Sequence, residues 1–266
     1  MSAAPGRPKQ ATRLVFITGA SSGIGRALAK RFHDAGWQLA LVARREAELN
    51  AWAAGQGWPA GHWRVYGADV AQTGSIVAAG HACLAAQGVP DVVIANAGIS
   101  IGMDTAERAD LEVMAQTFAT NNIGMAATFH PFIEPMRARG SGTLVGIASV
   151  AAIRGLPGHG AYCASKAGVV SYCESLRGEL SSAGIKVVTG VPGYVDTPLT
   201  QGNRYAMPFL MTPEAFAERA VRAIEAGASY RVIPWQMGVA AKLLRVLPNA
   251  LFDRLLVGRP RKARKQ

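Results

Sequence analysis

Leu14-Val15-Phe16-Ile17, followed by Thr18-Gly19-Ala20-Ser21-Ser22-Gly23-Ile24-Gly25, joins a short apolar run to a glycine-rich turn. The apolar run predicts a buried parallel strand, and the four-residue spacing of Ile24, Leu28 and Phe32 predicts an amphipathic helix. Between such a strand and helix, glycines let the backbone approach a pyrophosphate, and the first helical N–H groups face its negative charge. The glycine spacing differs from the G-x-G-x-x-G fingerprint, but its setting favours nucleotide binding over an ordinary loop.

Tyr162 and Lys166, in Gly160-Ala161-Tyr162-Cys163-Ala164-Ser165-Lys166, form a second informative pair. In a helix, side chains four residues apart lie one turn apart on the same face, so an ammonium group can sit beside a phenol. A nearby cation lowers the phenol pKa from its usual value of about 10. Such a tyrosine can exchange a proton near neutral pH, which the interconversion of a carbonyl and an alcohol requires. By itself, the pair is also compatible with an ordinary surface contact.

The order of these and other motifs resembles the short-chain dehydrogenase/reductase family over nearly the whole chain. Three motifs match by several residues each: T-G-x3-G-x-G by Thr18, Gly19, Gly23 and Gly25, N-A-G by Asn96-Ala97-Gly98, and Y-x3-K by Tyr162 and Lys166. The family's helix asparagine matches Asn121, and its serine matches Ser149. Its P-G motif matches Pro192-Gly193, with Thr197 downstream. There are two small departures. Ala148 stands where the family usually has a first serine before Ser149, and the asparagine could be Asn122 instead of Asn121.

The resemblance implies roles for four catalytic residues. Ser149 would hydrogen-bond the substrate oxygen, and Tyr162 would exchange a proton with that oxygen. Lys166 would hold the ribose hydroxyls and lower the tyrosine pKa, while Asn121 would anchor a water molecule that links the lysine to solvent. The implied cofactor-binding residues are Thr18, Gly19, Ser21, Ser22, Gly23, Ile24, Gly25, Arg44, Asp69, Val70, Asn96, Ala97, Gly98, Tyr162, Lys166, Pro192, Gly193, Val195 and Thr197.

The residue after the second predicted strand favours NADP(H) over NAD(H) as the cofactor. Arg44 stands where an acidic residue would bind a ribose hydroxyl of NAD, and a guanidinium group there can pair with a 2′-phosphate. The alternative is an ordinary solvated helix start, because Glu46 and Glu48 follow. Asp69, before Val70, matches the family's adenine-ring position; alternatively, it caps the next helix.

Length and hydrophobic periodicity agree with a single α/β domain. The chain has 266 residues, of which 50% are hydrophobic and 17% charged, so it can bury a sizeable core. Strand patterns fall near 14–18, 37–43, 63–66, 91–95, 143–148, 186–191 and 230–234. Helical patterns fall near 24–35, 73–87, 106–138, 162–182 and 213–226. Because the two alternate, we expect a Rossmann-like doubly wound parallel sheet of about seven strands with helices on both faces.

Cysteine spacing indicates neither a metal site nor a disulfide framework. Cys83, Cys163 and Cys173 lack metal-ligand spacing, and their number is odd. We therefore expect no catalytic metal. The N-terminus lacks the apolar core of a signal peptide, so we expect a cytoplasmic protein, either free or at the inner face of a membrane.

Positive charge is concentrated at the two ends of the chain. The net charge is +11, of which residues 238–266 carry +7 and residues 1–13 carry +3. The body between them carries +1, so nucleic-acid binding is not expected. We divide the chain into a flexible basic N-terminus (1–12), an NAD(P)-binding catalytic domain (13–237) and an amphipathic, basic C-terminal tail (238–266).

The tail has competing interpretations. Lys242, Arg245, Asn249 and Asp253 recur at helical spacing among apolar residues, and Pro248 predicts a division into two short helices. The charges argue against a membrane span, but an apolar-rich amphipathic segment with a basic end suits the surface of an anionic membrane. Alternatively, the helices pack over the substrate pocket or against a second subunit.

Together, these features predict an NADP-dependent oxidoreductase that acts on a hydrophobic carbonyl or secondary alcohol. Apolar residues are frequent in segments 99–103, 150–153 and 205–211, which we expect near the substrate. The family usually forms homodimers or homotetramers through its long helices, here 106–138 and 162–182.

Two alternatives remain. One is a reductase of 3-oxoacyl chains bound to an acyl carrier, in which Arg154 or Arg204 meets the carrier's acidic surface. The other is a non-catalytic cofactor-binding protein or membrane-associated regulator. The presence of Ser149, Tyr162 and Lys166 disfavours this second alternative.

Overall fold

The computed structural model describes residues 12–203, 205–258 and 262–264. Its centre is a seven-stranded parallel sheet with the order β3-β2-β1-β4-β5-β6-β7. The strands are β1 (Leu14–Thr18), β2 (Gln38–Ala43), β3 (Trp63–Gly67), β4 (Val92–Ala95), β5 (Gly142–Ile147), β6 (Ile185–Pro192) and β7 (Tyr230–Ile233). Their bounds differ from the predicted ones by at most one residue, and the doubly wound sheet is confirmed.

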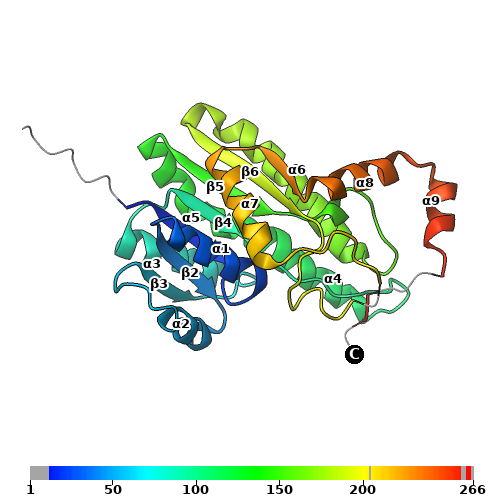
Figure 1. Ribbon diagram of the computed structural model, residues 1–266, viewed down its shortest axis with the longest axis horizontal. Helices are drawn as coiled ribbons and strands as arrows, with labels where there is room; N and C mark the ends of the chain where they lie inside the picture. Colours follow the sequence, from blue (N-terminus) through cyan, green and yellow to red (C-terminus); the bar gives the residue numbers. More distant parts are fainter. Residues whose placement is uncertain (1–11, 204, 259–261, 265–266) are drawn as a thin grey trace, which may run out of the picture.

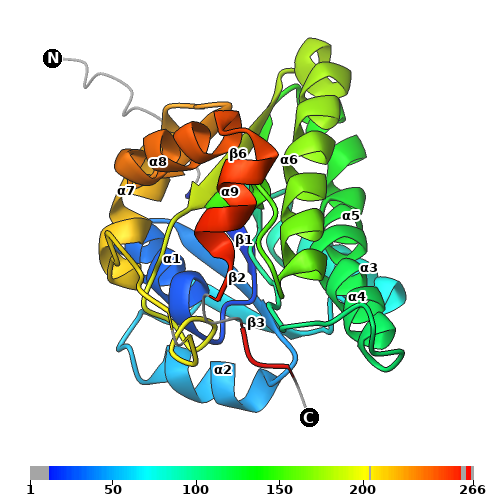
Figure 2. The ribbon, with the colours of Figure 1, turned by 90° about the vertical axis from the view of Figure 1, so that its right-hand side faces the viewer.

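Helices cover both faces of the sheet (Figures 1 and 2). One face packs against α1 (Gly23–Asp34), α2 (Glu46–Ala54) and α7 (Pro213–Glu225). The other packs against α3 (Thr73–Gln87), α5 (Gly124–Arg139) and α6 (Gly160–Leu180). Two short 3-10 turns, η2 (Val150–Ala152) and η3 (Ser181–Ala183), follow β5 and α6. Because both faces are covered, the central strands are continuously apolar rather than alternating.

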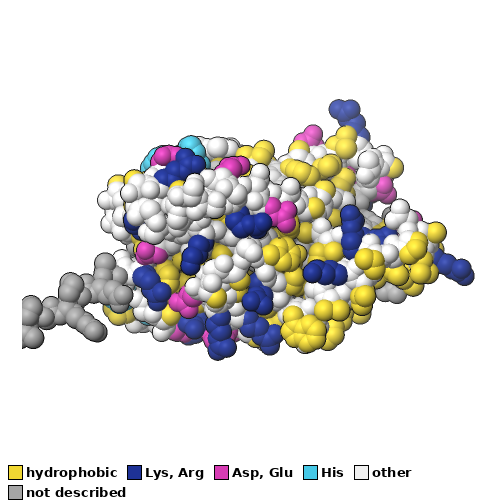
Figure 3. Space-filling view, turned by 90° about the horizontal axis from the view of Figure 1, so that it is seen from above, with side chains coloured by type: hydrophobic (Ala, Val, Ile, Leu, Met, Phe, Trp, Pro, Cys, Tyr) yellow, Lys and Arg dark blue, Asp and Glu magenta, His cyan; other side chains and the backbone are white. Residues whose placement is uncertain are grey.

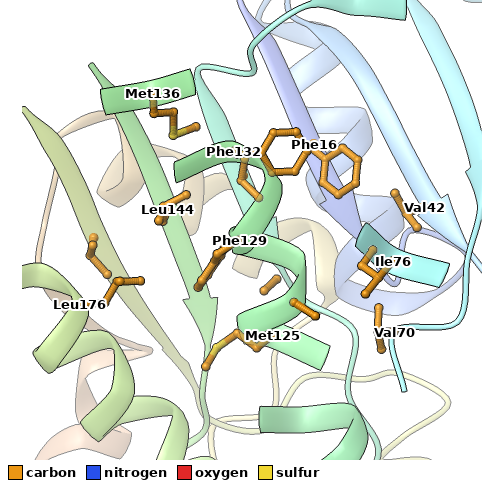
Figure 4. Packing of buried hydrophobic residues seen from close by; sticks show 14 of the residues in the cluster. Phe16, Val42, Val70, Ile76, Met125, Phe129, Phe132, Met136, Leu144 and Leu176 are labelled. Carbon is orange, nitrogen blue, oxygen red and sulfur yellow. The ribbon is translucent and has the colours of Figure 1, made fainter. Parts of the chain in front are cut away.

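Successive residues of β1 pack into the two different cores. Phe16 belongs to the core under α3 and α5, where its ring centroid lies 4.8 Å from that of Phe132 (Figure 4). Ile17 belongs to the opposite core, together with Leu28 of α1. All four side chains are fully buried. Burial of one such side chain contributes about 1.5–3 kcal/mol, so β1 anchors both helical layers.

The strand order reverses at β1, which lies between β2 and β4. The segments after β1 and β4 meet at this point: Asn96 Nδ2 donates to the carbonyl oxygens of Thr18 (3.0 Å) and Gly19 (3.3 Å). In doubly wound sheets, ligands bind beyond the carboxyl ends of the strands at such a reversal. The fold therefore places the expected ligand site at this edge of the sheet.

The single helix predicted over 106–138 is divided into three elements. α4 spans Asp110–Phe118, a π-helical turn (η1) spans Ala119–Ile123, and α5 follows. The first helix starts later than predicted because the Asp110 carboxylate accepts the N–H of Asp104 at 2.7 Å, which holds the preceding residues in turns. The π-helical turn contains buried Asn121, whose side chain bonds outside its own helix.

α2 is absent from the helical patterns of the sequence analysis, which gave a solvated helix start after Arg44 only as an alternative. Leu49 and Ala53 are the buried residues of this helix, and they lie one turn apart. Two buried positions in nine residues form too narrow a stripe to stand out as a helical pattern.

The tail forms two helices, α8 (Trp235–Val246) and α9 (Asn249–Leu256), at one end of the long axis of the molecule (Figure 1). Pro248 stands between them, as the sequence predicts. Since α8 begins before residue 238, the proposed boundary between catalytic domain and tail falls within a helix. Every helix in the described part of the chain is too short or too polar to cross a lipid bilayer.

Candidate active site

A cavity of about 470 Å³ opens at the carboxyl ends of β1, β2 and β4. Residues from separate loops line it, and most of them belong to the predicted cofactor-binding set. These are Gly19, Ser21, Ser22, Gly23, Ile24, Arg44, Asp69, Val70, Asn96, Ala97, Gly98 and Thr197. The fold thus brings the predicted glycine turn, strand ends and N-A-G segment to one hollow.

The glycine turn fits a group that needs close approach to the backbone. Gly19 and Gly23 have φ values of +66° and +48°, which glycine adopts without strain. A Cβ on Gly23 would lie 2.8 Å from Thr197 Cγ2, and a Cβ on Gly25 would collide with the carbonyl of Gly19. α1 begins within this turn and has no acidic residue in its first turn, so its positive end is not neutralised. These features suit the diphosphate of a dinucleotide.

Thr18 holds together two of the segments that line this cavity. Its side chain is buried, and its Oγ1 accepts the N–H groups of Asn96 (3.1 Å) and Ala97 (3.2 Å). The hydroxyl group therefore aligns the segment after β4 with the glycine turn. Thr18 and Gly25 are the predicted glycine-turn residues that do not line the cavity wall.

Arg44 and Asp69, the residues expected to recognise the adenosine part of a nucleotide, line the same cavity. Arg44 is exposed on the cavity wall, whereas the neighbouring Arg45 binds the carboxylate of Glu48 at 2.6 Å. Asp69 also lines the cavity, and its Oδ1 accepts the N–H of Ala71 at 3.0 Å. The aspartate therefore stabilises a turn before α3 and lies next to the ligand space. It does not cap α3, whose N-cap is Gln72, so its alternative interpretation is not confirmed.

Ser149, Tyr162 and Lys166 meet in an adjoining cavity of about 100 Å³. Tyr162 and Lys166 lie on α6, and Ser149 follows β5 as the N-cap of η2. Lys166 Nζ lies 5.9 Å from the centroid of the Tyr162 ring and donates to the carbonyl oxygen of Ile147 at 2.8 Å. The other predicted residues on this wall are Ile24, Asn96, Gly98, Pro192, Gly193, Val195 and Thr197.

Burial dominates the electrostatics of these residues. It lowers the pKa of Lys166 to about 8, because a buried ammonium group loses its hydration. Burial also raises the pKa of Tyr162, and a hydrogen bond with the Ser149 hydroxyl acts in the opposite direction. The expectation that Lys166 lowers the phenol pKa is therefore not met here. The ammonium group is engaged by the Ile147 carbonyl, and desolvation of the phenol has the larger effect.

Asn121 connects the segment after β4 to α6. Its Oδ1 accepts the N–H of Ile99 (2.9 Å), and its Nδ2 donates to the carbonyl of Ile99 (3.0 Å) and to Ser165 Oγ (2.9 Å). The alternative asparagine, Asn122, donates to the carbonyl of Ser165 at 2.8 Å. Asn121 thus braces the site through protein contacts, and its predicted role in holding a water molecule stays a prediction.

A third cavity, of about 460 Å³, reaches Ser149 and Tyr162 from the side of the tail. Its apolar wall is formed largely by Met237, Ala240, Ala241, Leu244, Phe252 and Leu256 of α8 and α9. The tail therefore covers the pocket, which is one of the alternatives that the sequence left open. Of the segments expected near the substrate, Val150 and Phe209 line this cavity, whereas Met103 is buried and its sulfur accepts the N–H of Ala161 at 3.2 Å.

Polar side chains also line this cavity. Tyr205 lies in a segment expected near the substrate, whereas the sequence analysis did not anticipate His159, Asn203 or Lys262. Tyr205 Oη lies 3.3 Å from His159 Nε2, and Lys262 Nζ donates to Asn203 Oδ1 at 2.9 Å. Burial lowers the pKa of His159, which favours the neutral imidazole at pH 7. His159 precedes Tyr162 by three residues, and this spacing could have indicated that the two side chains lie on the same side of the helix. No local pattern connects Lys262 with Asn203.

Arg154 fastens the tail to the body of the protein. Its guanidinium donates to the carbonyl of Leu247 (2.8 Å) and to Asn249 Oδ1 (3.0 Å), and its Cζ lies 3.7 Å from the centroid of the Phe252 ring. These contacts hold the side chain against the tail, and its predicted contact with an acyl carrier stays a prediction. The other candidate for that contact, Arg204, lies outside the described residues.

The described residues contain no group of three or more His, Cys, Asp or Glu side chains that could hold a metal ion. Cys83, Cys163 and Cys173 are buried free thiols, and burial raises the pKa of each. The thiol form therefore predominates at neutral pH, and packing explains these positions.

Comparisons with known proteins give consistent matches. A family model described as short chain dehydrogenase matches residues 13–207. An uncharacterized oxidoreductase of Myxococcus xanthus is 37% identical over 242 residues, which cover 91% of this chain and 95% of that protein. A short-chain dehydrogenase from Sphingobium yanoikuyae, solved in complex with NADPH, is 26% identical with a TM-score of 0.74, covering 90% of this chain and 97% of that one. A 3-ketoacyl-(acyl-carrier-protein) reductase from Brucella melitensis, complexed with NADH, is 29% identical with a TM-score of 0.74, covering 83% and 94%.

Proposed function

Because this chain belongs to the short-chain dehydrogenase/reductase family of oxidoreductases, we propose that it interconverts a hydrophobic carbonyl compound and its secondary alcohol, using NADP(H). When bound, the nicotinamide supplies or accepts the hydride. One observation carries the proposal: Ser149 and Tyr162 line both the cavity that holds Lys166 and the apolar cavity under the tail. A substrate oxygen placed beside them would lie within reach of both hydroxyl groups.

The chain's own residues then handle the proton and the charge on the substrate oxygen. In the direction of reduction, Tyr162 donates its proton to that oxygen, and Ser149 donates a hydrogen bond that stabilises the developing charge. The raised pKa of Tyr162 keeps the phenol protonated at neutral pH, which suits an acid. Lys166 would hold the ribose hydroxyls, and Asn121 would maintain the segment on which Asn96, Ala97 and Gly98 lie.

Replacing Tyr162 with phenylalanine tests this mechanism. The Tyr162→Phe protein should keep its fold and its affinity for NADPH, while NADPH oxidation with a panel of aldehydes and ketones falls by about 10²–10⁴-fold. Wild-type turnover in this variant would refute the assigned proton donor. A wild-type protein that reduces no carbonyl in the panel, yet binds NADPH, would favour the non-catalytic regulator.

The preference for NADP rests on Arg44. Its exposed guanidinium lines the nucleotide cavity, and Arg45 is already paired with Glu48. An exposed arginine at this strand end is well placed to bind a 2′-phosphate. The relatives do not decide the matter, since one solved structure contains NADPH and another contains NADH. With NADPH as the cofactor, reduction is the expected physiological direction.

A hydrophobic small molecule is a better-supported substrate than a carrier-bound acyl chain. The third cavity has an apolar wall contributed by α8 and α9, and such walls bind lipid-like groups. The resemblance to a 3-ketoacyl-(acyl-carrier-protein) reductase keeps the second alternative in view. However, Arg154 is hydrogen-bonded to the tail and lines the third cavity, which does not favour its contact with the surface of a carrier.

The outer face of the tail supports contact with an anionic membrane. Trp235, Leu243 and Val246 of α8 have exposed fractions of 67%, 62% and 77%, and Lys242 is exposed among them. Figure 3 shows apolar side chains gathered with Lys and Arg side chains at the end of the molecule where α8 and α9 lie. This combination suits a surface that rests on anionic lipid headgroups. We place the protein in the cytoplasm, at the inner face of a membrane.

The long helices support a homo-oligomer. Leu111 and Met114 on α4, Ile123 in the π-helical turn and Tyr172 on α6 are exposed large apolar side chains. A second copy covering this face in a homodimer or homotetramer would bury them.

A further inference from the structure

Lys262 brings a positive charge to the wall of the substrate cavity. Its Nζ donates to the carbonyl oxygen of Leu199 (2.7 Å) and to Asn203 Oδ1 (2.9 Å). The same cavity contains Ser149 and Tyr162, so the ammonium group and the reacting groups share one space. Neither bonded partner of the lysine carries a charge.

The lysine has no carboxylate partner among the described residues. It is half-buried, and this burial lowers its pKa, which shows that the charge is poorly solvated. Ammonium groups have three N–H donors, and the two neutral acceptors account for two of them. A charge removed from water is stabilised best by a counter-ion, and here the open side is the cavity.

Contacts of the two residues that follow Lys262 hold it in place. The carbonyl of Ala263 accepts the N–H of Gly102 at 3.1 Å, and Gly102 has no room for a Cβ beneath this strand of chain. Arg264 Nε donates to the buried carboxylate of Asp110 at 2.7 Å. Arg264 is therefore satisfied by its own counter-ion. Arg154 also lines the cavity, but its guanidinium is bonded to Leu247 and Asn249 of the tail, so Lys262 is the described cation that lies beside Asn203 in this cavity.

The two walls of the cavity have different characters. Leu244, Phe252 and Leu256 belong to the apolar wall, while His159, Tyr205, Asn203 and Lys262 form the polar one. The coulombic effect of Lys262 lowers the pKa of His159, so the two side chains are near enough to influence one another. A ligand with an apolar body and an acidic group would match both walls.

We propose that this cavity binds an amphiphilic carbonyl substrate, an apolar chain with a carboxylate or phosphate, whose anionic group is held by Lys262. This inference rests on the proposed function, because it names the substrate class of the same site. Lys262 acts as a specificity-determining residue for the anion, and Tyr162 acts on the carbonyl.

A matched pair of ketones tests the proposal. We compare kcat/KM for 9-oxodecanoate with kcat/KM for its methyl ester, which lacks the charge and carries one additional methyl group. The wild-type protein should prefer the acid, and Lys262→Gln should reduce the acid-to-ester ratio by about tenfold or more, as expected for loss of a charge-assisted hydrogen bond. Lys262→Arg should retain most of the ratio. Lys30→Gln, which removes an exposed charge on α1 outside every described cavity, should leave the ratio as it is.

A binding measurement separates this inference from the proposed function. Isothermal calorimetry with NADPH-saturated protein compares decanoate, decyl phosphate and decanol, with wild-type protein and Lys262→Gln. Stronger binding of one or both anions, lost in the variant, supports the proposal and shows which anion is preferred. Equal binding of decanol and the anions, or equal loss of all three in the variant, overturns it and assigns Lys262 a structural role. If neither ketone is reduced but decanoate still binds through Lys262, the proposed reaction fails while the anion site stands.

Discussion

Lys166 shows how burial changes what a residue contributes. Its ammonium group lies beside Tyr162 as the helical spacing predicts, yet it bonds to the Ile147 carbonyl. Burial lowers its pKa to about 8 and raises that of Tyr162. The position of Lys166 therefore reduces the stability of the folded state, because a charged group has been taken from water.

We expect Lys166→Met to lose activity and gain stability at neutral pH. A lysine whose pKa falls on folding from 10.5 to about 8 destabilises the folded state by roughly 3 kcal/mol below pH 8. Losing the bond to Ile147 costs about 1 kcal/mol, so a net gain of about 2 kcal/mol in the free energy of unfolding is expected at pH 7. Turnover should fall by at least about 100-fold.

The pH dependence of the free energy of unfolding provides the control for Lys166→Met. Between pH 8 and 10.5 the unfolded lysine binds more protons than the folded one, so wild-type stability gains with rising pH from this residue. The advantage of Lys166→Met should therefore be largest at pH 7 and shrink by pH 10, as measured by urea unfolding. A variant less stable than wild type at pH 7 would contradict the burial argument.

Arg44 should decide the choice between NADPH and NADH. In Arg44→Ser, kcat/KM for NADPH should fall by about 10- to 100-fold, because a charge-assisted bond to the 2′-phosphate is lost. The value for NADH should change much less. Arg45→Ser is the matched comparison, and its effect should be smaller because Arg45 is paired with Glu48. Equal losses with both cofactors in Arg44→Ser would remove the basis for NADP preference.

At the scale of elements, one side chain, that of Arg154, contacts the residues that join α8 to α9. Arg154 donates to the carbonyl of Leu247 at the end of α8, to Asn249 at the start of α9, and packs over the Phe252 ring. These helices supply the apolar wall of the substrate cavity, so the arginine links the shape of that cavity to the tail.

We expect Arg154→Met to loosen both tail helices. Loss of its charge-assisted hydrogen bonds should lower the local opening free energy by about 2 kcal/mol, which corresponds to roughly 30-fold faster amide exchange over 238–256. Hydrogen–deuterium exchange with mass spectrometry measures this directly. Lys242→Met, an exposed position on α8, is the control and should leave exchange unaltered. Unchanged protection of α9 in Arg154→Met would show that other contacts hold it.

At the scale of the whole molecule, the tail separates an inner face from an outer face. The inner face of α8 and α9 lines the cavity, and the outer face exposes apolar and basic side chains (Figure 3). A membrane-bound enzyme could receive apolar substrates directly through this end. The net charge of +7 in residues 238–266 favours anionic lipid over neutral lipid.

Vesicle co-sedimentation tests this arrangement. Full-length protein should pellet with phosphatidylglycerol vesicles and much less with phosphatidylcholine vesicles. The double substitution Leu243→Ser and Val246→Ser should weaken binding at least about tenfold, since each side chain would lose its burial in the interface. Leu210→Ser, at an exposed apolar position outside the tail, is the control. No pelleting of the wild-type protein with anionic vesicles would rule out the membrane contact.

Sequence patterns determined the sheet and most helices, because these depend on local physics. The family followed from the resemblance of several motifs in a fixed order. A buried strand must be apolar, a helix repeats every 3.6 residues, and the turn at Gly19 and Gly23 needs positive φ. Patterns with few buried positions, such as α2, escaped detection for the same reason.

Tertiary structure alone decided what surrounds the reacting groups. Two contacts join segments that are distant in the chain: the bond of Lys262 to Asn203 and the attachment of Arg154 to the tail. Tyr162 loses its hydration because such segments pack around it. A side chain's charge state and partners depend on which surfaces come into contact after folding. Periodicity along the chain does not predict these contacts.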